Sequence, residues 1–105
     1  MAVKVLITRR FKRDSIKEAH RLLNELRSMV TIKLGYISGQ TLVSASDPDK
    51  VLVISTWTNK KRWDEWYESS KRKEFTQKLN EILQSPEQVE VFYVGEKEPE
   101  WVDMA

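Results

Sequence analysis

The 105-residue sequence has no cysteine, one histidine, three glycines and three prolines. Without cysteine, the chain has no disulfide bonds, thiolate nucleophiles or zinc–thiolate sites. A lone histidine lacks the partners that a catalytic triad or a metal centre requires. No apolar run approaches the roughly 20 residues that span a bilayer, and 18 basic residues nearly balance 16 acidic ones. We therefore expect no bound metal, no nucleic-acid partner, no membrane association and a cytoplasmic location.

Hydrophobic residues make up 40% of the chain and charged residues 32%, a composition that supports one core and a soluble surface. The length is typical of one domain. We therefore expect a single domain over residues 1–105, with residues 96–105 as a charged C-terminal tail. No dinucleotide-binding, P-loop, nucleophile-elbow or zinc-protease motif is present.

The first third of the chain predicts a strand and then a helix. In residues 2–10, Val3, Val5 and Ile7 alternate with residues of the opposite face, as expected for a strand. Residues 15–18 read SIKE, the form of a capping box, and an apolar stripe at helical spacing follows to residue 30.

The remaining pattern predicts three more strands and a second helical region. Residues 31–46 predict a long strand that bends or bulges at its glycines, 46–49 a turn, and 50–58 a strand. Thr58 or Asn59 caps a helical region that breaks near Ser69-Ser70 and ends at residues 85–86, before a last strand at 88–94. The order βαββαβ predicts an α+β, ferredoxin-like fold: a four-stranded antiparallel sheet with helices on one face.

Three of these strands are apolar on both faces. An antiparallel sheet with one face in water alternates apolar and polar residues, but residues 3–8, 50–57 and 88–94 do not. Two helical regions cover only one face, so a second surface must cover the other. We predict a homodimer that buries this face.

Residues 53–69 read VISTWTNKKRWDEWYES. A strand that ends in Trp57, a polar cap, and a helix with Trp66 nine residues later and Ser69 shortly after resembles the antibiotic biosynthesis monooxygenase (ABM) family of dimeric α/β barrels. The resemblance implies two facing sheets and a small-molecule cleft between each sheet and its helices. Some members of the family oxidise aromatic polyketides without a cofactor, and others degrade haem.

The haem-degrading branch uses an Asn in the first strand, a Trp in the second helix and a His further along that helix. Only the Trp carries over, to Trp66. The strand position falls near Thr8, and the His position falls between Thr76 and Leu79, where no imidazole is available. We therefore predict no haem degradation and no cofactor.

The resemblance and the residue types together suggest a ligand site formed by Trp66, Trp57, Thr8 and Tyr36. The two hydroxyls can hydrogen-bond a carbonyl or a phenol. Core packing is the competing interpretation for Trp57 and for Trp66, which stands at helical spacing from Trp63.

The other polar candidates have simpler interpretations. The basic runs at residues 9–13, 60–62 and 71–73 alternate with acidic residues, so we expect them to lie on solvated faces. An anionic substrate attracted to Arg9 has no further support in the sequence. We expect His20 to lie at the boundary of its helix's apolar stripe rather than to act as a base.

Two functions fit these observations. The first is a cofactor-independent monooxygenase acting on a small aromatic or quinone-like molecule. The second is a non-catalytic dimer that binds a small apolar or aromatic ligand. An RNA-recognition module shares the element order but needs exposed aromatic rings on its third strand, and residues 50–57 (KVLVISTW) lack them. We also expect Trp101 and Val102 of the tail to pack on the partner subunit.

Overall fold

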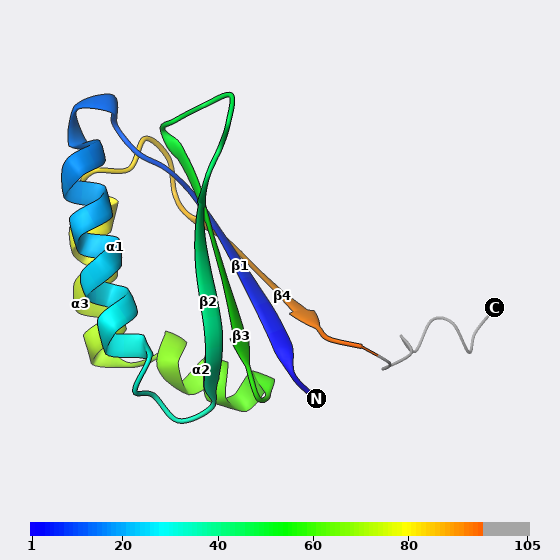
Figure 1. The fold of residues 1–105 in the computed structure, drawn as a ribbon. Helices are drawn as coiled ribbons and strands as arrows, with labels where there is room; N and C mark the ends of the chain where they lie inside the picture. Colours follow the sequence, from blue (N-terminus) through cyan, green and yellow to red (C-terminus); the bar gives the residue numbers. More distant parts are fainter. Residues whose placement is uncertain (96–105) are drawn as a thin grey trace.

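The computed structural model describes residues 1–95. Its sheet is flanked by helices on one side (Figure 1). The elements in chain order are β1 (Val3–Arg10), the 3₁₀ turn η1 (Arg13–Ser15), α1 (Ile16–Val30), β2 (Tyr36–Val43), β3 (Lys50–Trp57), α2 (Lys60–Tyr67), α3 (Ser70–Asn80) and β4 (Gln88–Tyr93). The predicted tail contact of Trp101 and Val102 lies outside the described residues.

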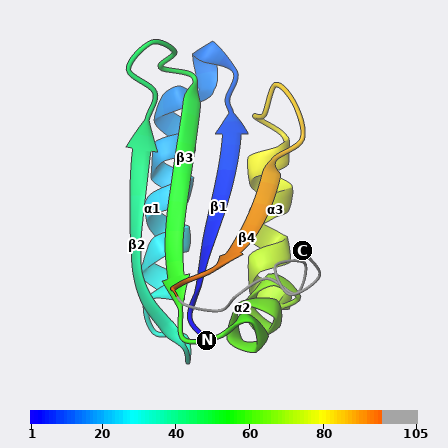
Figure 2. The ribbon, with the colours of Figure 1, turned by 90° about the vertical axis from the view of Figure 1, so that its right-hand side faces the viewer.

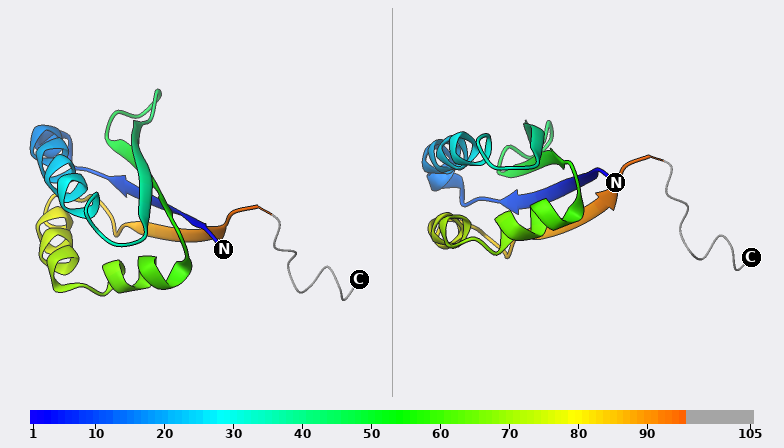
Figure 3. Two further views of the ribbon diagram at one scale, coloured as in Figure 1. Left: turned by 60° about the horizontal axis from the view of Figure 1, so that its bottom comes forward. Right: turned by 90° about the horizontal axis from the view of Figure 1, so that it is seen from below.

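The four strands form one antiparallel sheet in the order β2-β3-β1-β4 (Figure 2). In the two central strands Val5 pairs with Ser55, and on its other side Val5 pairs with Val91 of β4. Helices α1 and α3 lie over one face, and α2 lies across the end where β3 finishes (Figures 1 and 3). The predicted ferredoxin-like α+β fold is thus confirmed. No helix among residues 1–95 is long and apolar enough to cross a membrane.

Side-chain caps divide the second helical region in two. The Asn59 side chain accepts a hydrogen bond from the Arg62 amide at 2.9 Å and caps α2. The Ser69 hydroxyl accepts from the Arg72 amide at 3.3 Å, which caps α3, and donates to the Trp66 carbonyl at 2.7 Å. Ser69 therefore closes one helix and opens the next, as the predicted break required.

The predicted capping box at residues 15–18 is wrong. Ser15 has φ −110° and ψ 10° rather than the extended backbone of a cap, and it makes no side-chain bond to the helix. Its hydroxyl instead contacts Asp14 at 3.4 Å, while Glu18 accepts from Arg21 Nε at 3.0 Å. The turn η1, which precedes α1 directly, holds Ser15 in a conformation that a capping side chain cannot use.

The predicted long strand at residues 31–46 is also wrong in its first third. Residues 31–35 form a turn, in which the Lys33 amide donates to the Val30 carbonyl at 2.9 Å. Gly35 has φ +91°, a left-handed conformation that side chains rarely adopt. The predicted irregularity is present as a register shift between Tyr36 and Ser38.

The core lies between the sheet and the helices. The predicted inward face of β1 is confirmed, because Val3, Val5 and Ile7 are all buried. One cluster gathers around Phe11 and α1, and the other gathers around Trp57 and α2. The second cluster borders the candidate site.

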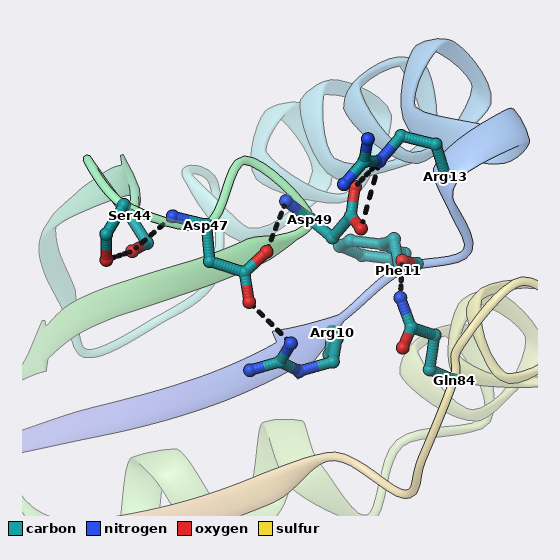
Figure 4. Close-up of polar contacts among 8 residues, drawn as sticks. Arg10, Phe11, Arg13, Ser44, Asp47, Asp49 and Gln84 are labelled. Carbon is teal, nitrogen blue, oxygen red and sulfur yellow. Dashed lines mark hydrogen bonds and ion pairs between the residues drawn. The ribbon is translucent and has the colours of Figure 1, made fainter.

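Polar contacts join the β2–β3 turn to the end of β1 (Figure 4). The buried Asp49 carboxylate accepts from Arg13 Nε at 2.9 Å, and its carbonyl accepts from the Phe11 amide at 2.8 Å. Arg10 pairs with Asp47, and the Gln84 side chain donates to the Phe11 carbonyl at 2.7 Å. This network ties three separate segments together.

The sheet face opposite the helices is not covered by any described element (Figure 2), and its apolar residues lie among polar ones such as Lys4. Leu6 and Ile54 pair across β1 and β3 at its centre. Toward its edges Leu42 is 43% exposed and Phe92 is 48% exposed. The expected second apolar face is therefore present only in part, as a strip that contains these four residues.

Candidate functional site

A cavity of about 60 Å³ opens between the helix side of the sheet and the helices. One water molecule needs roughly 10–15 Å³, so this space holds several waters or one compact planar group. Side chains from β1, β2, β3, α1, α2 and α3 line it. Its apolar lining consists of Ile7, Leu23, Leu26, Val30 and Val53.

Aromatic rings form one wall of the cavity. Trp57, fully buried at the end of β3, stands edge-on to Tyr36, with 5.5 Å between ring centroids. On its other side Trp57 meets Trp63 at 5.8 Å in a similar edge arrangement. Trp66, one helical turn beyond Trp63, also lines the cavity and is buried. Edge-to-face packing of this kind fixes ring orientation, so the wall is preformed.

The polar groups of the wall are few. Ser55 accepts a hydrogen bond from Trp57 Nε1 at 3.1 Å, which satisfies the buried indole. Gln40 and Thr41 reach the cavity from β2, next to Gly39. Two basic side chains of the lining come from opposite sides: Arg27 from α1, whose Nη2 donates to the Gly39 carbonyl at 2.9 Å, and Arg9 from β1.

Arg9 belongs to a buried ionic cluster with Arg72 and Glu87. Arg9 Nε donates to Glu87 Oε2 at 2.8 Å, and Arg72 Nη2 lies 3.5 Å from Glu87 Oε1. The Arg72 guanidinium also lies over the ring of Tyr67 at 4.7 Å and that of Trp63 at 5.4 Å. Burial lowers the pKa of Arg9, Glu87 opposes this shift, and the Arg72 cation adds to it.

The structure brings together three of the four predicted site residues. Trp66, Trp57 and Tyr36 line one cavity. Thr8 is not part of it, because successive residues of a strand point to opposite faces and Ile7 is the one that faces the helices. The sheet therefore separates Thr8 from the other three.

From the sequence, Arg9 was considered only for an anionic substrate, without further support, and Arg72 was not singled out. The expectation that their basic runs lie on solvated faces is wrong for both residues. Arg9 is 2% exposed and Arg72 is 4% exposed. Spacing carried a signal for each: Arg9 follows Ile7 by two residues on β1, and Arg72 precedes Phe75 by three on α3. Their shared partner Glu87 lies outside any element, where periodicity gives no signal.

Trp63 is buried in the core and also lines the cavity. His20 is half-buried on α1 and does not line the cavity. Within residues 1–95 no group of three or more His, Asp or Glu side chains is arranged to hold a metal ion.

The sequence model of the antibiotic biosynthesis monooxygenase family matches residues 2–78. Solved structures share the fold at low identity. A conserved protein from Methanosarcina mazei Go1 has a TM-score of 0.83 at 18% identity, with 88% of this chain and 91% of that chain covered. A protein from Mycobacterium tuberculosis also has a TM-score of 0.83 at 18% identity, with 92% and 98% covered.

SnoaB, a cofactor-independent oxygenase from Streptomyces nogalater, has a TM-score of 0.81 at 11% identity, with 94% of this chain and 98% of that chain covered. At such identities the structural similarity establishes the fold alone. Among curated proteins, none matches the sequence.

Proposed function

Because the chain belongs to the antibiotic biosynthesis monooxygenase family, we propose that it is a cofactor-independent monooxygenase that oxidises a small aromatic or quinone-like molecule. The observation that carries this proposal is the cavity walled by Trp57, Trp63 and Trp66. A buried apolar pocket with a few orienting polar groups is the usual form of a small-molecule site.

The proposed reaction requires few catalytic groups from the protein. A phenolic substrate that enters as its phenolate, having lost its proton to solvent water, is electron-rich enough at carbon to reduce oxygen; a carbon–oxygen bond forms, and the peroxide anion takes up a proton from water. Loss of water from the resulting peroxide leaves a carbonyl, so one oxygen atom enters the product and the other leaves as water. The rings of Trp57 and Trp66 would hold the substrate and exclude solvent, and the Tyr36 hydroxyl would hydrogen-bond a substrate oxygen.

Oxygen uptake tests this proposal. We expect purified protein to consume oxygen when a panel of hydroquinones and of phenols with one or two rings is added, above the rate of autoxidation. Trp66→Ala should lower the rate at least tenfold, because it removes one wall of the cavity. His20→Ala is the matched control and should leave the rate unchanged. Rates equal to autoxidation with every substrate would contradict the proposal.

A second candidate function is a non-catalytic binding protein. Among residues 1–95 the cavity lining contains no His, Asp or Glu, so no described side chain there serves as a general base near neutral pH. In that case tryptophan fluorescence should be quenched by the same compounds, through Trp66, without oxygen consumption. The two measurements on one sample separate a catalyst from a binder.

We further propose that the protein acts as a homodimer that buries the outer sheet face around Leu6 and Ile54. The support is the apolar strip on that face, which no described element covers. Sedimentation equilibrium at micromolar concentration tests this. A stable, soluble monomer would contradict it.

A further inference from the structure

The cluster of Arg9, Arg72 and Glu87 holds an excess of buried positive charge. Arg9 and Arg72 are almost fully buried, whereas Glu87, the one acidic member, keeps 16% of its side chain exposed. Two guanidinium groups remain charged at neutral pH, and one carboxylate balances only one of them. Buried charges in proteins are normally paired, so among residues 1–95 this cluster lacks one anion.

The hydrogen bonds of the cluster show where that anion is missing. Glu87 uses one oxygen for Arg9 Nε at 2.8 Å and turns the other toward Arg72 Nη2 at 3.5 Å. Arg9 Nη2 is buried and has no partner among the described residues. An arginine fork is suited to a planar carboxylate, and here one arm of the Arg9 fork is free.

Arg9 is also one of the residues that line the cavity already described, together with Arg72, Trp57, Trp63 and Trp66. A ligand lying against the indole rings therefore shares the cavity with apolar side chains and with the buried guanidinium groups of Arg9 and Arg72. This combination of an apolar bed and one buried, unpaired donor selects for a flat molecule with a single negative charge.

We propose that the cavity binds an aromatic carboxylate whose carboxylate oxygen accepts a hydrogen bond from Arg9 Nη2. The proposal rests on the proposed function only in that both use this cavity, and it names the class of molecule that the cavity prefers. Phosphate esters fit less well, because their second negative charge has no counter-ion in the cluster. The small volume favours one ring, or two fused rings, over a large polycyclic acid.

A matched pair of probes tests the charge preference. Benzoate and benzamide have nearly the same shape, but only benzoate is charged at pH 7. Binding to the full-length protein is measured by isothermal titration calorimetry and by tryptophan quenching. We expect benzoate to bind at least tenfold more tightly than benzamide. Equal affinities would overturn the proposal, because they would mean that water alone satisfies Arg9.

Substitution of Arg9 tests the site. In Arg9→Gln, benzoate affinity should fall at least tenfold, while benzamide affinity should stay within twofold of the wild-type value. Arg21→Gln removes an exposed arginine of α1 that pairs with Glu18 and Glu25, and it should change neither affinity. An equal fall for benzoate in both variants would mean that net charge, not Arg9, attracts the ligand, and would overturn the assignment.

The two proposals fail separately. If quinols are oxidised but benzoate shows no advantage over benzamide, the carboxylate site is wrong and the monooxygenase proposal stands. If benzoate binds through Arg9 but no oxygen is consumed with any substrate, the monooxygenase proposal is wrong and the carboxylate site stands. Where Arg9→Gln does not fold, as judged by circular dichroism, the benzoate–benzamide comparison in the wild-type protein still decides.

Discussion

Gly39 and Tyr36 share a space that leaves no room for another side chain: a Cβ on Gly39 would stand 2.4 Å from Tyr36 Oη. Both residues line the cavity on β2. The hydroxyl therefore rests directly on the backbone of its own strand, and a methyl group at residue 39 would push the tyrosine ring toward the tryptophans.

Gly39→Ala should therefore destabilise the protein by roughly 1–3 kcal/mol, the usual cost of overpacking. The same substitution in a Tyr36→Phe background should cost markedly less, because the clashing oxygen is gone. Urea unfolding of the four proteins of this cycle measures the coupling. Equal costs in the two backgrounds would show that the ring moves away freely.

Ser55→Ala should lower stability by about 1–3 kcal/mol, because it leaves the buried Nε1 of Trp57 without an acceptor. In a Trp57→Phe background the serine has no indole to satisfy, so the cost of Ser55→Ala should shrink. Thermal or urea unfolding measures the stability cost of Ser55→Ala in both backgrounds. A cost that is the same in both backgrounds would argue that Ser55 acts through packing instead.

Ser69→Ala should destabilise the protein by about 1 kcal/mol through loss of the α3 cap. Ser15→Ala is the natural comparison, since Ser15 precedes α1 but does not cap it, and its effect should be within about 0.5 kcal/mol of zero. Equilibrium unfolding of the pair distinguishes a working cap from a sequence that only resembles one. Similar losses of stability for both serines would contradict this prediction and would mean that Ser15 caps α1 in solution.

Glu87→Gln should be the most damaging of these changes, with a loss of about 3–5 kcal/mol. It leaves the buried guanidinium groups of Arg9 and Arg72 without a counter-ion. Glu74→Gln, on the exposed side of α3, provides the control and should have little effect. Saturating benzoate should recover part of the stability of Glu87→Gln, and a loss below about 1 kcal/mol would mean that the cluster is well hydrated.

Ile54→Lys tests the proposed dimer. A lysine at the centre of the outer face would bury an unpaired charge in the interface and should weaken dimerisation at least 100-fold, or about 2.8 kcal/mol. Asn24→Lys adds the same charge on the exposed side of α1 and should leave the dimer intact. Analytical ultracentrifugation of both variants gives the answer, and an unaffected Ile54→Lys dimer would place the interface elsewhere.

Local patterns predicted much of this fold, and their failures have physical causes. Alternation in β1 placed Val3, Val5 and Ile7 correctly inward. The same alternation places Thr8 on the sheet face away from the cavity. Thr8 was predicted as a site residue for its hydroxyl, and that choice conflicted with the strand geometry. Ser15 does not cap α1, because the 3₁₀ turn η1 fixes its backbone conformation. No residue spacing in the sequence predicts this turn.

The ionic part of the site was hidden for a different reason. A charged residue in a run of charged residues is normally solvated, and only tertiary structure buries Arg9 against Glu87, which is 78 positions away in the sequence. A contact between residues so far apart produces no periodic pattern in the sequence. The aromatic part of the site, by contrast, was suggested by the family resemblance of residues 53–69, since spacing alone left core packing open for Trp57 and Trp66.

The sheet order also has a consequence for the chain during synthesis. β1 is central, and its second edge is completed only by β4, the last strand of the order. After β3 has left the ribosome, residues through Tyr93 still have to follow, which takes on the order of a few seconds at roughly 5–20 residues per second. During that interval the apolar edge of β1 is open to pairing with a strand of a neighbouring nascent chain. Chaperone demand should therefore peak before β4 emerges, and slowing translation between α3 and β4 should increase aggregation.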